Sequence, residues 1–172
     1  MTDTIQSWLL DNRKQLDKMD IKYIRHHILS NQINPYGQFY LTYKIHKGLK
    51  NNRWPTRHVC SDISSLPHGL GKWIDKTLQP IATAQLSYLN ESFALKDILT
   101  TLCLPPNALL FTCDAVSMYT NIQTLPALNL ISAYLRANEG TLFHHYHSDT
   151  IIEALEIVFQ NNFIQFGDTY WQ

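Results

Sequence analysis

The sequence predicts a chain of mixed α+β class, and three observations lead to that class. Apolar side chains recur at helical spacing in several segments of ten or more residues. Two short segments alternate in polarity and are rich in β-forming residues. The 172 residues are 45% hydrophobic and 16% charged, a composition that allows a sizeable buried core. Long helices combined with few strands are typical of the α+β class.

The first segment, residues 3–29, is predicted to be helical. Its apolar side chains recur at roughly helical spacing among charged ones, and they are Ile5, Trp8, Leu9, Leu16, Met19, Ile24, Ile28 and Leu29. The sequence NPYG at residues 34–37 then predicts a turn, because proline and glycine interrupt regular structure. We therefore expect residues 1–37 to form an N-terminal helical segment that precedes a second unit over residues 38–172.

A hairpin is predicted to follow this segment. Residues 38–46 alternate in polarity and contain many β-forming side chains, which favours a strand. Residues 47–55 are polar and basic and contain Gly48 and two asparagines, which favours a hairpin tip or an exposed loop. Residues 57–61 resume as a strand. Two strands that flank a basic loop predict a finger-like hairpin.

The middle of the chain predicts two helices and a buried strand. Residues 70–84 carry one apolar stripe, and Pro80 is expected to limit the end of this helix. Residues 92–102 predict a second helix, and the sequence PPN at residues 105–107 breaks the chain. Residues 108–114 form a short apolar run that ends in an acid, a pattern that favours a buried central strand.

The last third predicts two helices and a closing hairpin. Residues 124–137 form the first helix, with Pro126 near its first turn, where proline is well tolerated. Residues 148–161 form the second. Residues 163–172 predict a hairpin whose turn lies near Gly167.

The formal charge of the whole chain is zero, but the charges are unevenly distributed. Residues 1–39 carry a net charge of +1, residues 40–76 carry +5, and residues 77–172 carry −6. A basic block beside an acidic half could bind an anion on one side and cations on the other. The alternative interpretation is that these charges only solvate two surfaces.

Three cysteines cannot all pair within one chain, and their spacing matches no metal motif. We therefore expect a reduced, intracellular protein. No apolar stretch approaches the roughly 20 residues that a membrane span needs, so we expect no membrane partner.

Asp114 is the most informative candidate for chemistry. A carboxylate at the end of a buried strand is costly unless something compensates its charge. A divalent cation is one such compensation, and phosphoryl-transfer enzymes use carboxylates to hold Mg²⁺ against phosphate oxygens. The alternative is that Asp114 caps a helix or binds within a loop.

Aromatic side chains interleave with the cations around the predicted hairpin. They are Tyr36, Phe39, Tyr40, Tyr43 and Trp54. Such rings could stack on bases while the cations contact phosphates. The alternative is that they pack within the sheet, as strand aromatics usually do.

The sequence FTCDAVSMYTNI at residues 111–122 resembles the first palm motif of reverse transcriptases, in the form typical of Penelope-like retroelements. The sequence KIHK at residues 44–47 resembles a fingers strand of that family, and residues 57–61 resemble the next fingers strand. Residues 163–172 are similar to the hairpin before the second palm motif. The resemblance covers residues 38–172 in the right order and implies the fingers and a partial palm of a right-hand polymerase.

The resemblance also implies roles for individual residues. Asp114 would be the catalytic carboxylate that binds both Mg²⁺ ions, and the backbone carbonyl of Ala115 would bind one of them. Tyr119 would lie beneath the nucleotide sugar and exclude a 2′-hydroxyl. Lys44 and Arg57 would lie near the triphosphate, where cations neutralise phosphate charge.

The implied partners are an RNA or DNA template-primer and a dNTP, and the implied reaction is Mg²⁺-dependent nucleotidyl transfer by an RNA-directed DNA polymerase. In the basic loop, Lys47, Lys50 and Arg53 would contact nucleic acid. Nuclear residence would follow only from what a retroelement enzyme needs.

The sequence departs from the family in two ways. Tyr43, His58 and Gln123 stand where the family usually has proline, and the chain contains no Asp-Asp pair. We therefore expect a polymerase truncated before its Asp-Asp motif and inactive alone. Three hypotheses stay open: a truncated retroelement product, a non-catalytic nucleic-acid-binding module derived from it, and an unrelated α+β interaction domain.

Overall fold

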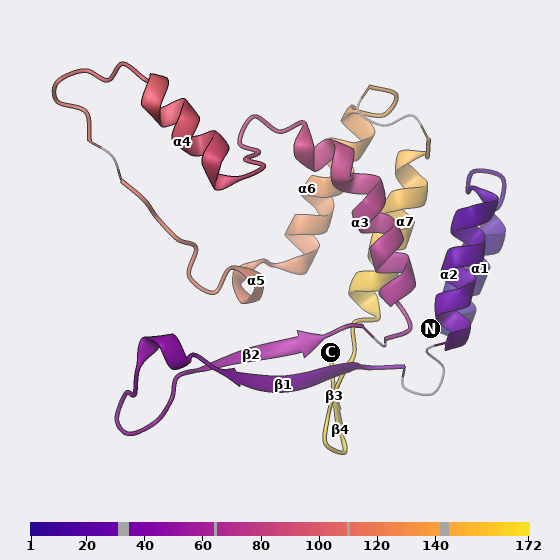
Figure 1. Ribbon diagram of the computed structural model, residues 1–172. Helices are drawn as coiled ribbons and strands as arrows, with labels where there is room; N and C mark the ends of the chain where they lie inside the picture. The colour runs from indigo at the N-terminus through magenta and orange to yellow at the C-terminus, as the bar shows by residue number, and fades with distance from the viewer. Residues whose placement is uncertain (31–34, 64, 110, 142–144) are drawn as a thin grey trace.

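The computed structural model describes residues 1–30, 35–63, 65–109, 111–141 and 145–172, apart from the side chains of residues 119 and 120. The described chain is of the α+β class, as the sequence predicts. Figure 1 shows a group of helices standing above a long β-hairpin, and a second, shorter hairpin beside it. Within these residues, no helix combines the length and the apolar character that crossing a membrane requires.

The N-terminal segment, predicted to be helical over residues 3–29, consists of two helices, α1 (Thr2–Asp11) and α2 (Lys18–Ser30), with a turn between them. Asn12 ends α1, because its backbone N–H and its side-chain amide both donate to the carbonyl of Trp8, at 3.0 and 3.1 Å. A side chain that hydrogen-bonds to the local backbone competes with continuation of the helix. The chain therefore turns after α1, and α2 packs against it.

Within the described ranges, four strands form one sheet in the order β2-β1-β3-β4. The strands are β1 (Gly37–Tyr43), β2 (Thr56–Ser61), β3 (Ile164–Phe166) and β4 (Thr169–Trp171). β1 pairs antiparallel with β2 and parallel with β3, so the sheet joins segments from opposite ends of the chain. The two predicted hairpins are confirmed. Gly167 lies in the turn of the second with a φ of 57°, a conformation that glycine adopts without strain.

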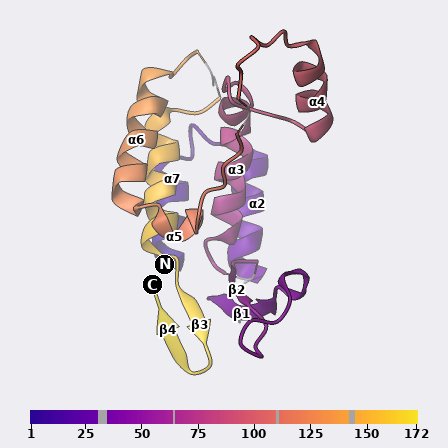
Figure 2. The same cartoon turned by 90° about the vertical axis from the view of Figure 1, so that its left-hand side faces the viewer.

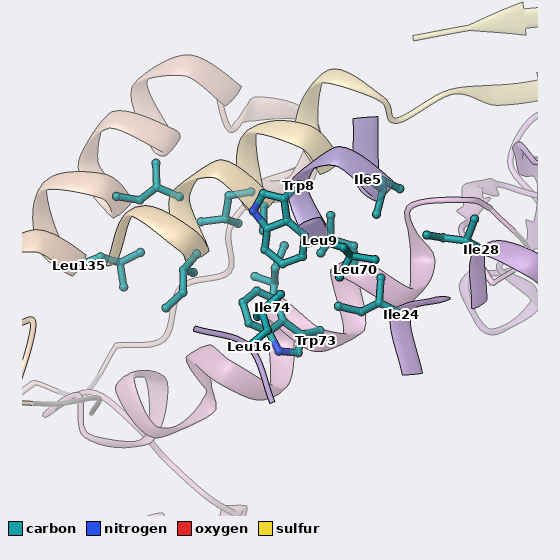
Figure 3. Close-up of a cluster of buried hydrophobic side chains, with 14 of the residues drawn as sticks. Ile5, Trp8, Leu9, Leu16, Ile24, Ile28, Leu70, Trp73, Ile74 and Leu135 are labelled. Carbon is teal, nitrogen blue, oxygen red and sulfur yellow. The ribbon is translucent and has the colours of Figure 1, made fainter. Parts of the chain in front are cut away.

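The core lies among the helices α1, α2, α3 (His68–Thr83), α6 (Thr124–Ala137) and α7 (Ser148–Gln160). α7 is the central member, because α1, α3 and α6 all pack against it. Trp8 and Trp73 meet edge to face in this core, with ring centroids 5.4 Å apart (Figure 3). The predicted helices at 124–137 and 148–161 are thus confirmed, to within one residue.

Pro80 does not limit the third helix, which runs on to Thr83. Proline removes the hydrogen bond to the carbonyl four residues earlier, and here that carbonyl belongs to Lys76. Both Pro80 and Lys76 are exposed, so water can satisfy the freed carbonyl. The hydroxyl of Thr83 donates to the carbonyls of Gln79 and Pro80, at 3.0 and 3.1 Å, and closes the last turn.

A long excursion leaves the helices between α3 and α6. It contains α4 (Ser92–Thr101), which confirms the predicted helix, and the short α5 (Met118–Asn121). The strand predicted over residues 108–114 is wrong: the described residues of this run form irregular chain, and they are exposed. Leu110 lies outside the described residues. A strand is stable only when a neighbouring strand takes up its backbone groups, and no described strand pairs with this run.

Candidate nucleic-acid interface

The β1–β2 hairpin carries the candidate interface. Its strands are paired from Gln38 opposite Ser61 to Tyr43 opposite Thr56. Lys44 extends the pairing by donating its backbone N–H to the carbonyl of Pro55, at 2.8 Å. The chain therefore reaches the tip of the hairpin as a well-aligned two-stranded ribbon, which projects from the helices (Figure 1).

The tip is a tight reversal that points cations outward. Lys50 and Arg53 exchange two backbone hydrogen bonds of 2.9 Å each. Asn51 and Asn52 between them have φ angles of 50° and 58°, left-handed values that asparagine tolerates better than most residues. Lys47 lies in η1 (Ile45–Lys47), a single 3₁₀ turn on the strand leading to the tip. The hairpin tip predicted over residues 47–55 is thus confirmed.

Charge is strongly one-sided along this hairpin. Residues 37–61 contain no Asp or Glu, and they contain five Lys or Arg residues. These are Lys44, Lys47, Lys50, Arg53 and Arg57. Four of them are exposed, and Lys44 is half-buried. No ion pair joins any of the five to a carboxylate in the part of the chain that the structure describes. Their positive charge is therefore available to an external anion.

Lys44 and Arg57, which were predicted near a triphosphate, are brought together by the hairpin. Arg57 lies directly opposite Thr42, and directly opposed residues of an antiparallel pair point to the same face of the sheet. Lys44 follows Thr42 by two residues, and side chains two residues apart along a strand share a face. The two cations thus lie on one side of the ribbon, near its outer end.

The aromatic side chains divide into two groups. Phe39 stacks on His58 and meets Phe166 of β3 edge to face, with ring centroids 5.9 and 5.2 Å apart. Tyr36 packs against Tyr170 of β4 at 4.7 Å. The packing interpretation therefore holds for Phe39 and Tyr36. Tyr40, Tyr43 and Trp54 are exposed, so their rings are accessible to bases.

Asp114 lies far along the chain from these cations and is exposed. No hydrogen bond or ion pair joins its carboxylate to another described residue. Ala115 is exposed beside it. Tyr119 belongs to α5, but its side chain lies outside the described residues, and its contact with a nucleotide sugar stays a prediction. The hairpin register therefore places Lys44 and Arg57 on one side of the ribbon, and no hydrogen bond or ion pair among the described residues joins Asp114 to either.

The described residues do not fit the predicted magnesium site. Magnesium requires near-octahedral oxygen ligands, and a two-metal site needs several carboxylates around one point. Within the described residues there is no group of three or more His, Cys, Asp or Glu side chains that could hold a metal ion. Asp114 and the carbonyl of Ala115 supply fewer ligands than magnesium needs, and the magnesium site stays a prediction of the family resemblance.

A polar cluster that sequence reasoning missed anchors the base of the hairpin. Asp62 follows β2 directly, and its carboxylate accepts a hydrogen bond from Ser65 and contacts His68 Nδ1 at 3.3 Å. The His68 ring in turn lies 5.8 Å from that of His27 on α2. Ser65 and His68 come just before and at the start of α3. Their spacing of three and six residues from Asp62 was the available signal for this contact.

In comparisons with known proteins, no family model, no curated protein and no solved structure matches the chain.

Proposed function

We propose that this chain binds RNA or DNA through the β1–β2 hairpin, as the fingers and first palm segment of a reverse-transcriptase-like protein of a Penelope-like retroelement. One observation carries the binding proposal: an exposed hairpin with five cations and no carboxylate along residues 37–61. The motif resemblance at residues 44–47 and 111–122 supports the family. The α+β class is compatible with fingers and a partial palm.

Phosphate charge is what such a hairpin recognises. Each Lys or Arg that meets a phosphate releases condensed counterions, which makes binding tight at low salt and weak at high salt. Lys47, Lys50 and Arg53 at the tip suit contacts along a nucleic-acid backbone. Trp54 beside them offers a ring on which a base can stack. We therefore propose that the hairpin contacts mainly the sugar-phosphate backbone of the nucleic acid and has little sequence preference.

Catalysis by the isolated chain is not part of the proposal. The family reaction, Mg²⁺-dependent nucleotidyl transfer to a primer from a dNTP, needs a carboxylate cluster. Asp114 is exposed and has no carboxylate partner among the described residues. We therefore propose that the chain alone binds nucleic acid and does not extend a primer.

The test compares two triple variants of equal charge change. Lys47→Ala/Lys50→Ala/Arg53→Ala removes the tip cations. The matched control, Lys18→Ala/Lys22→Ala/Arg25→Ala, also removes two Lys and one Arg, all three exposed on α2. Binding of a fluorescently labelled RNA oligonucleotide is measured by anisotropy across a salt series.

The tip variant should weaken binding strongly and lower the slope of log K against log salt by about one unit per lost cation. The control should keep most of the slope of the wild-type chain. Equal losses in the two variants would show that net charge alone, rather than the hairpin, holds the oligonucleotide. Binding that neither variant weakens would favour the unrelated interaction domain.

A further inference from the structure

Helix α4 is amphipathic but buries nothing. Its apolar stripe consists of Ala94, Leu95, Ile98 and Leu99, continued by Leu102 just after the helix. Lys96, Asp97 and Thr100 lie on the opposite side. Phe93, which is 71% exposed, shares that side, and Thr101 lies at the edge of the stripe. A stripe at this spacing ordinarily faces a core. Here no residue of α4 is buried, and Leu95, Ile98 and Leu99 are 42%, 53% and 41% exposed.

An apolar groove lies nearby, between α3 and α6. It has a volume of about 410 Å³, and its apolar lining is Leu78, Ile81, Ala82, Leu130, Ile131 and Leu135. Ile81 and Leu135 form a buried floor, and Leu130 is a rim residue that is 74% exposed.

One end of the groove is fixed by a bond between the two helices. The side-chain amide of Gln85, just after α3, donates to the hydroxyl of Tyr134 on α6 at 2.9 Å. Both walls also pack against α7, so their arrangement does not depend on α4.

We propose that α4 closes over this groove as a strap, with its apolar stripe against α3 and α6. The connection supports this occupant. Residues 84–91 join α3 to α4, and eight residues can span at most about 29 Å. The backbone N–H of Tyr88 donates to the carbonyl of Gln85 at 2.9 Å, so the chain already turns at the start of this connection. A short connection favours an antiparallel arrangement of the two helices it joins.

Attachment favours α4 over a separate molecule. A short flexible linker gives a tethered element an effective concentration in the millimolar range, above that of an unattached partner at micromolar concentration. Closure also leaves Lys96 and Asp97 in water, so no charge is desolvated. Closure removes the apolar surfaces of the α4 stripe and of the groove from water, and this burial drives the closure. Figures 1 and 2 both show α4 standing clear of α6, so closure is a movement of the strap.

The test is a pair of cross-linking variants in the full chain, with Cys60, Cys103 and Cys113 replaced by serine. Leu99→Cys/Leu130→Cys joins the stripe to the groove rim. Thr100→Cys/Leu130→Cys is the matched control, because Thr100 lies on the opposite side of α4. A disulfide needs Cα atoms within about 7 Å. Under mild oxidation the first pair should lose its free thiols to a bond within one chain, and the control pair should keep them.

Three results would overturn the strap: equal thiol loss in both pairs, no loss in either, or disulfides that form only between chains. A measurement without a cross-link guards against a variant that perturbs the fold. The alkylation rate of a single Leu130→Cys thiol should rise several-fold when Leu95→Asp/Leu99→Asp is added. It should stay unchanged with Lys96→Asp/Thr100→Asp, on the other face. Equal rates in these two backgrounds would also refute the proposal.

Discussion

A Cβ atom placed on Gly69 of α3 would lie 2.5 Å from the Cβ of His27 on α2. Unbonded carbon atoms do not approach this closely, and a Cβ cannot swing away as the end of a long side chain can. The two helices therefore touch here through the backbone of Gly69. This contact joins the N-terminal pair of helices to α3, whose first turn follows the base of the hairpin.

Gly69→Ala should destabilise the protein, because the helices must separate to admit the methyl group. Overpacking of this kind costs about 1–3 kcal/mol. Gly71→Ala is the matched control: it lies in the same helix, and nothing lies within 4 Å of its added Cβ. Since alanine favours helix over glycine by up to about 1 kcal/mol, that variant should be more stable. Urea unfolding of both variants tests the pair, and a neutral or stabilising Gly69→Ala would contradict the contact.

Protonation should act on the same contact. The pKa of His27 lies below its usual 6.5, first because burial disfavours the charged imidazolium and then because His68 and His26 lie nearby. Tyr23 on α2 also packs against the ring, and Asp62 contacts His68. The unfolded chain therefore takes up a proton at His27 more readily than the folded chain. By linkage, the stabilisation that comes from keeping His27 uncharged in the folded chain is complete above pH 6.5 and is lost as the pH falls below that value.

His27→Gln should accordingly flatten the dependence of unfolding free energy on pH in the window just below 6.5. His46→Gln, on the exposed η1 turn, should leave the slope as in the wild-type chain. The measurement is a series of urea unfolding curves from neutral to mildly acidic pH. A His27→Gln slope identical to that of the wild type would refute the assignment.

The elements that could be predicted from the sequence are those whose signals are local. The helix at 124–137 and the hairpin turn at Gly167 follow from periodicity and from turn chemistry, and both are present. The strand at 108–114 could not be judged this way, because a strand depends on a partner elsewhere in the chain. The break at Asn12 was also missed, since apolar spacing continues roughly through it.

Part of the candidate site could likewise be predicted from local sequence, and part could not. The basic hairpin was predictable, because an absence of carboxylates over residues 37–61 is visible in the sequence itself. The contacts among Asp62, His68 and His27 were not, because His27 lies 41 positions before His68 and only folding brings them together. The roles of Asp114 and Tyr119 rest on the family resemblance and stay predictions.

The buried link between α1 and α7 offers a further test. The hydroxyl oxygen of Thr150 lies 2.9 Å from Asn12 Oδ1 and 2.7 Å from Gln15 Oε1. Thr150→Val keeps the shape but removes the donor, which leaves a buried acceptor on Asn12 unsatisfied. We expect a loss of about 1–3 kcal/mol in unfolding free energy.

The control for this link is Thr77→Val, because Thr77 donates only to the carbonyl of Trp73 in its own helix, at 2.8 Å. Loss of such a local bond should change the unfolding free energy by no more than about 0.5 kcal/mol. If the two variants lose equal amounts of stability in urea unfolding, the hydrogen bonding of Thr150 to Asn12 and Gln15 stabilises the fold no more than a local helix bond does.

Asp114→Asn separates the family prediction from the behaviour of this chain. The carboxylate is exposed and has no partner among the described residues, so its removal should change the unfolding free energy by no more than about 0.5 kcal/mol. Titration calorimetry with Mg²⁺ should give the same weak signal before and after the change, because one carboxylate is a poor magnesium ligand. Asp20→Ala is the contrasting variant: Asp20 accepts a hydrogen bond from Tyr146, and removal of this acceptor should destabilise the fold. A Mg²⁺ affinity that falls only in Asp114→Asn would mean that further ligands already surround Asp114, and that this chain assembles more of a catalytic centre than its exposed carboxylate indicates.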